Sequence, residues 1–170
     1  VAYDDRVVEL DPSDGRLRAE TSLRPLLEGR TSTSARITAL DLVIRGAGGL
    51  VGSSWVEPSG GGEPFGLVWE LPVGGDAPFV RVSSSTEHAA ALALDRDESL
   101  VLLLRAGAPR AGGVAAERVA RLGPDNLPEA SWTSSPVETR ASGISIDAAG
   151  RVVWTAGLRI FTRTGQPTQL

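Results

Sequence analysis

The chain has 170 residues, a formal net charge of −4 and 41% hydrophobic residues, a composition typical of a folded globular protein. The acidic balance argues against a nucleic-acid partner, because such binding at physiological salt depends on clustered cations. Cysteine is absent, which excludes disulfides and thiolate metal sites. No stretch approaches the roughly 20 apolar residues of a spanning helix, so we expect no transmembrane segment.

One type of element recurs along the chain as an apolar strand that ends in a Gly/Pro/Asp turn. Its three copies are RVVELDPSDGRL from Arg6, FGLVWELPVGGDA from Phe65 and RVARLGPDNLPEASW from Arg118. Leu71 and Leu122 lie 122 − 71 = 51 residues apart within the second and third copies. The segment AAERVARL is locally good helix material, but its place in the repeat favours a strand.

Leu23 to Ser34 lengthens the first copy of this pattern. The interval from Leu10 to Ile44 is 34 residues, against 23 from Leu71 to Leu94. We therefore expect an insertion here, with one short helical turn in LRPLLEGR before a Ser/Thr-rich loop.

A second recurring element is predicted to be a β-hairpin. Ala39–Arg45, Ala89–Asp95 and Ala141–Asp147 align without gaps, at steps of 95 − 45 = 50 and 147 − 95 = 52 residues. Each copy alternates apolar and other residues at period two, then meets a turn and a second apolar run, as a hairpin requires. Repeats of this length are typical of propeller blades and solenoid turns.

The repeat resembles the bacterial β-propeller repeats of the SBBP type. The resemblance is carried by GISIDAAGRVVWTAG at Gly143 to Gly157, by VVELDPSDGRL at Val7 to Leu17, and by Trp132 at the closing aromatic position. The copy that ends at Arg45 departs from the pattern, since the family has Asp there. The two recurring elements share one period and so make a repeat of about four strands, and the resemblance implies a propeller architecture for it.

These patterns predict an all-β protein with about three four-stranded antiparallel blades that form part of a β-propeller, in repeat units 6–64, 65–116 and 117–170. Propellers close with four to eight blades, and an open arc leaves exposed strand edges. We therefore expect a protein partner or a second copy to complete the ring, or further residues of the same polypeptide, since the chain does not begin with Met.

Three residues are candidates for ligand binding. His88 is the only histidine and precedes a strand that propellers place near the central channel; Arg140 occupies the equivalent place in the next repeat. Trp55 is one of four tryptophans that offer stacking surfaces for a carbohydrate, although filling the space between blades is the commoner role. We predict no catalytic residue, because His88 lacks an evident partner.

The acidic turn at 95–98 has oxygen ligands suited to Ca²⁺ but lacks the spacing of a calcium loop, so we predict no metal site and no cofactor. For Asp95 and Asp147 we expect a structural role, in which the carboxylate accepts hydrogen bonds from amides of the following turn.

The leading functional hypothesis is a non-enzymatic binding or scaffold module, exported to the periplasm or exterior, that contacts a protein or a carbohydrate through loops on one face. Two alternatives remain open. One is a propeller enzyme of the lyase or hydrolase type with a site over the channel, and the other is a structural subunit of a larger assembly or filament. Fold alone does not decide among them.

Overall fold

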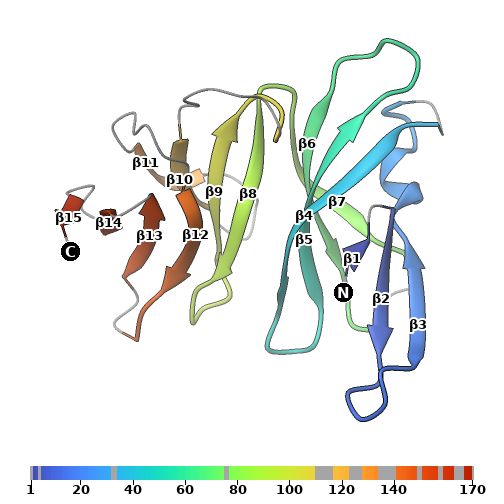
Figure 1. The fold of residues 1–170 in the computed structure, drawn as a ribbon, viewed down its shortest axis with the longest axis horizontal. Coiled ribbons are helices and arrows are strands. Elements are labelled where there is room, and N and C mark those ends of the chain that lie inside the picture. The colour runs from blue at the N-terminus through green and yellow to red at the C-terminus, as the bar shows by residue number, and fades with distance from the viewer. Residues whose placement is uncertain are drawn as a thin grey trace. The chain divides into compact units, whose positions relative to one another are not determined.

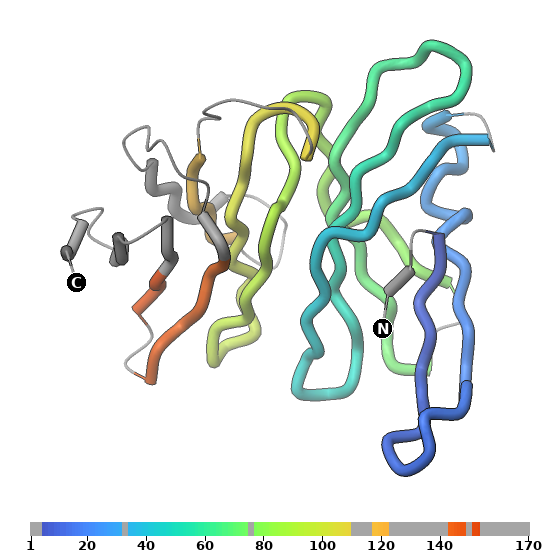
Figure 2. The backbone as a smooth tube through the Cα atoms, in the orientation of Figure 1, coloured from blue at the N-terminus to red at the C-terminus, as the bar shows by residue number. Residues whose placement is uncertain are grey.

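The chain folds as an all-β protein in the computed structural model (Figure 1). It divides into two compact units, Val1–Ser85 and Thr86–Leu170. The backbone path is followed most easily in Figure 2. The structure describes residues 2–3, 5–31, 34–74, 77–109, 117–122, 128–133, 141–148, 151–156, 159–162 and 167–169.

The N-terminal unit contains two antiparallel sheets, one three-stranded in the order β1-β2-β3 and one four-stranded in the order β4-β5-β6-β7. A short 3-10 helix, η1 (Arg24–Leu27), connects them. The strands are β1 (Ala2–Tyr3), β2 (Arg6–Leu10), β3 (Leu17–Ser22), β4 (Arg36–Ile44), β5 (Leu50–Glu57), β6 (Phe65–Leu71) and β7 (Phe79–Ser84).

The C-terminal unit contains two four-stranded sheets, in the orders β8-β9-β10-β11 and β12-β13-β14-β15. All pairs are antiparallel and join neighbours in the chain. The strands are β8 (Glu87–Leu94), β9 (Leu100–Ala106), β10 (Glu117–Leu122), β11 (Pro128–Thr133), β12 (Ala141–Ile146), β13 (Val152–Ala156), β14 (Arg159–Thr162) and β15 (Pro167–Gln169).

The three four-stranded sheets begin with the same hairpin. The closing register pairs are Ile44 with Leu50, Leu94 with Leu100, and Ile146 with Val152. Each first strand also carries one extra residue at the same distance from the hairpin, between 39 and 41, 89 and 91, and 141 and 143. Such β-bulges bend and twist a strand locally, so the three sheets share a bend as well as a connectivity.

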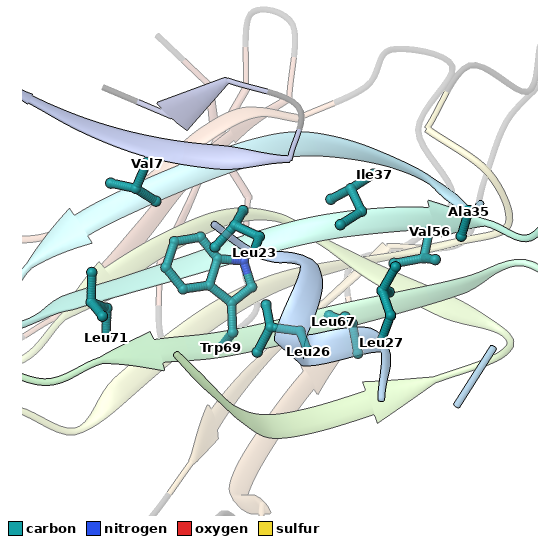
Figure 3. Close-up of a cluster of buried hydrophobic side chains, with 10 residues drawn as sticks. All are labelled: Val7, Leu23, Leu26, Leu27, Ala35, Ile37, Val56, Leu67, Trp69 and Leu71. Atoms are coloured by element: carbon teal, nitrogen blue, oxygen red, sulfur yellow. The ribbon is translucent and has the colours of Figure 1, made fainter. Parts of the chain in front are cut away.

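The core of the N-terminal unit forms around Trp69, which is fully buried on β6. Figure 3 shows its indole with Leu23 beside the ring and Leu26 of η1 below. The ring fits because its register partner on β5 is Gly52, where an added Cβ would lie 2.1 Å from Trp69 Cζ2. The cluster consists of Val7, Leu23, Leu26, Leu27, Ala35, Ile37, Val56, Leu67, Trp69 and Leu71.

The core of the C-terminal unit lies between its two sheets. Val101, Leu103 and Val119 form one side, and Val152 of β13 packs against them with Ile144 and Ile146 of β12. These side chains come from alternate positions of their strands, as a sheet with one face in a core requires. The period-two alternation of the sequence therefore produced this packing.

The predicted all-β class is confirmed, as are the three hairpins and the helical turn of the insertion, which is η1. Residues 117–122 form strand β10 and not a helix. The described sheets differ from the predicted repeat units in phase, because units starting at 65 and 117 start on the third strand of a sheet. The arrangement of the sheets as propeller blades stays a prediction.

Candidate functional site

A hollow of about 450 Å³ opens on the N-terminal unit where β6 begins and β7 ends. Because these strands run antiparallel, with Gly66 opposite Ser84, the start of one and the end of the other meet at the same edge. The hollow is lined by Arg30, Glu63, Phe65, Ser83, Ser84 and Ser85.

The insertion between β3 and β4 supplies one wall of this hollow. Leu26 and Leu27 are only 3% and 2% exposed, so η1 is anchored in the core and fixes the chain that follows it. The backbone N–H of Arg30 donates to the Leu27 carbonyl at 3.0 Å. The Arg30 guanidinium then donates to Ser83 Oγ at 3.2 Å, 53 residues away in the chain.

The hollow combines opposite charges with hydroxyls and one aromatic ring. Arg30 and Glu63 are exposed, whereas Phe65 is half-buried and packs against the core cluster. Serine hydroxyls donate and accept hydrogen bonds, and a guanidinium only donates. The lining therefore offers donors, acceptors and an apolar surface to one small ligand.

The predicted ligand residue His88 lies inside the C-terminal unit, where it is 2% exposed. Its Nδ1 lies 2.6 Å from the carbonyl oxygen of Gly107. Because a carbonyl oxygen only accepts, Nδ1 carries the proton in this contact. The neighbouring Glu87 pairs with Arg118 at 2.6 Å, and this pairing raises the pKa of Arg118.

Of the other two predicted ligand residues, the structure describes one. Trp55 is 4% exposed on β5, which agrees with the space-filling role weighed for it. Arg140 lies outside the described residues, and so do the side chains of Trp132 and Trp154. Ligand binding by His88, Arg140 and Trp55 stays a prediction.

A row of buried polar residues crosses the sheet β8–β11. His88 on β8 is the register partner of Arg105 on β9, which in turn is the partner of Glu117 on β10. Arg105 Nε donates to Glu117 Oε1 at 2.8 Å, and the two side chains are only 11% and 4% exposed. A buried pair with this geometry satisfies both charges.

The acidic hairpin at 95–98 is held by an arginine. Arg121 Nη2 lies 3.2 Å from Asp95 and 2.6 Å from Asp97. The backbone N–H of Ser99, with its hydroxyl, lowers the pKa of Asp97. In the part of the chain that is described, no three potential ligand side chains group to hold a metal ion.

The structural role expected for Asp95 and Asp147 is confirmed. Asp95 Oδ1 accepts from the backbone N–H of Arg96 at 2.7 Å, and Asp147 Oδ1 accepts from that of Arg151 at 2.9 Å. Both carboxylates thus satisfy amides of their own hairpins.

Sequence reasoning did not select the residues of the hollow. The available signal was the 12-residue insertion, since departures from a repeat often form its binding face.

No helix among the described residues has the length and apolarity to cross a membrane. The chain matches no protein-family model, and no curated protein matches it significantly.

Proposed function

We propose that this chain is a segment of a β-propeller and works as a non-enzymatic binding or scaffold module. The observation that carries the proposal is the recurrence of one sheet design, with the same strand order, bulge and hairpin in three sheets. Repeated units of this kind provide a rigid frame, and binding residues are placed on the loops and insertions. The SBBP-type resemblance of the sequence supports the same architecture.

The end of β2 supports the view that a further sheet packs here. Leu10 closes β2 with a bulge between Glu9 and Leu10, as Leu122 closes β10 with a bulge between Arg121 and Leu122. Leu122 is 5% exposed, whereas Leu10 is 38% exposed and its register partner Leu17 is 58% exposed. We infer that a sheet of a second copy covers this leucine pair.

Light scattering on the purified 170-residue chain tests this proposal. The chain is expected to assemble, and the double variant Leu10→Arg with Leu17→Arg to shift the sample toward monomers, because it buries two charges at the contact. The control is Val73→Arg, which also replaces an exposed apolar side chain (62% exposed) with arginine but lies outside the leucine pair. It should leave the assembly unchanged. A compact wild-type monomer that unfolds cooperatively would contradict the proposal.

A further inference from the structure

We propose that the hollow at Arg30 binds one neutral sugar residue of a glycan. This inference rests on the proposed binding function and names its ligand class and its site. It starts from the insertion that carries η1, which forms one wall of the hollow. The Arg30 guanidinium of this wall reaches Ser83.

The polar groups of the hollow match the hydroxyls of a sugar. Each sugar hydroxyl both donates and accepts a hydrogen bond, as do the hydroxyls of Ser83, Ser84 and Ser85. Arg30 adds donors and Glu63 adds acceptors, so hydroxyls pointing in different directions all meet a suitable partner. An anionic ligand such as phosphate would place a like charge against the Glu63 carboxylate.

The charge balance also favours a neutral ligand. Arg30 and Glu63 are the two charged residues of the lining, with opposite signs. Anion sites instead gather several cations or backbone N–H groups around the ligand. The hollow therefore selects by hydrogen bonding and shape and not by net charge.

Phe65 supplies the apolar contact that a pyranose ring requires. Its side chain is half-buried, packed against the core on one side and lining the hollow on the other. The negative face of an aromatic ring attracts the positively polarised C–H groups of a sugar. The volume of about 450 Å³ lies within the range of small-molecule sites.

Saturation-transfer NMR and titration with methyl glycosides of glucose, galactose, mannose and N-acetylglucosamine test the proposal. At least one glycoside is expected to bind, with transfer to its C–H face. Arg30→Ala should weaken binding about tenfold, as expected for lost hydrogen bonds to a charged group. Phe65→Leu keeps an apolar side chain but removes the aromatic face, and should weaken binding by a similar factor.

The matched control is Arg16→Ala, which removes the same charge from an arginine with an 86% exposed side chain in the β2–β3 hairpin and should leave binding unchanged. Absence of binding by all four glycosides overturns the proposal, and so does equal affinity in Arg30→Ala. Stronger binding of glucuronate or inorganic phosphate than of any neutral glycoside also overturns it.

Light scattering on the same samples separates this inference from the proposed function. Assembly without glycoside binding overturns only the sugar site. Glycoside binding by a monomer that unfolds cooperatively keeps the sugar site and overturns the propeller segment.

Discussion

The sheets β4–β7 and β8–β11 share one strand order and one bulged hairpin. Their side chains differ in size, polarity and charge at matching register pairs. At the third register pair between the second and third strands, counted from the start of the second strand, Gly52 opposes Trp69 in the first sheet, whereas Leu102 opposes Ala120 in the second. The larger side chain of the pair therefore lies on the third strand in the first sheet (Trp69) and on the second strand in the second sheet (Leu102). Packing at a buried pair needs the space between the strands to be filled and does not need one particular residue.

A second pair differs in polarity. Five residues from the start of the second strand, Trp55 opposes Gly66 in the first sheet, whereas Arg105 opposes Glu117 in the second. A tryptophan–glycine pair and a buried ion pair thus occupy equivalent register positions. At these matching register positions the two sheets therefore carry side chains of different chemistry.

The third difference is a reversal of charge. In the first sheet Arg45 Nε lies 3.3 Å from Glu70 Oε1, and in the second Asp95 Oδ2 lies 3.2 Å from Arg121 Nη2. Glu70 and Arg121 are both one residue before the leucine that ends the third strand. Arg45, which stands where the other two hairpins have Asp95 and Asp147, is therefore accompanied by a partner of reversed charge.

The largest effect is expected from exchanging the Trp69 pair. Trp69→Ala should lower the free energy of unfolding by about 3–5 kcal/mol, because it empties the centre of the core cluster. Gly52→Leu alone should also destabilise, since its Cβ would clash with the indole. The double variant copies Leu102 and Ala120 and should recover part of the loss, measured by urea unfolding. Purely additive effects would refute volume exchange.

Removing the buried carboxylate should have the next largest effect. Glu117→Gln should cost about 3 kcal/mol, because it leaves the Arg105 guanidinium buried without its counter-charge. The matched control is Glu87→Gln, whose partner Arg118 has a side chain that is 34% exposed, and for which less than about 1 kcal/mol is expected. If the two variants lose the same free energy of unfolding in urea, burial does not determine the cost of removing the carboxylate.

Reversing the charges of the pair formed by Arg121 and Asp95 should have a smaller effect. Arg121→Glu should destabilise by about 1–2 kcal/mol, because it opposes two carboxylates at a half-buried position. Adding Asp95→Arg copies the order seen at Arg45 and Glu70 and should restore part of this loss, because Asp97 still faces the new carboxylate and the hydrogen bond from Arg96 to Asp95 is lost. A double-mutant cycle in thermal unfolding measures the coupling, and a coupling near zero would contradict an exchangeable pair.

The smallest effect is expected in the hairpin of the second sheet. Glu98 adopts a φ of +62°, and the equivalent residue of the first sheet is Gly48 with a φ of +92°. The backbone N–H of each donates to the carbonyl three residues earlier, at 2.8 Å. Glu98→Gly should therefore stabilise the chain by about 1 kcal/mol by relieving left-handed strain. A lowered melting temperature would contradict this.

Much of the fold could be predicted because its signals are local. The alternation around Leu92 and Ile144 specified strands, and the following turns specified hairpins. The bulges were not predicted, because an extra residue in a strand leaves no clear sequence signal and depends on the partner strand. Asp95 was assigned a structural role correctly, but its contact with Arg121 depends on strands 26 residues apart (121 − 95).

The hollow was not predicted from the sequence, because its residues come together only through contacts between distant segments of the chain. His88 was selected as a ligand candidate from its place along the chain, and the structure shows that it is 2% exposed with its Nδ1 against the Gly107 carbonyl oxygen. The hollow joins Arg30 to Ser83 across 53 residues, and nothing local to either residue indicates the other.

The sequence by itself determined the strands, the hairpins and the 51-residue spacing of Leu71 and Leu122, because backbone alternation and turn chemistry act between near neighbours. Only the tertiary structure decided which charges pair, which side chains are buried and where the insertion forms a hollow. Those outcomes depend on contacts between strands far apart in the chain, and equivalent contacts are satisfied here by different residues.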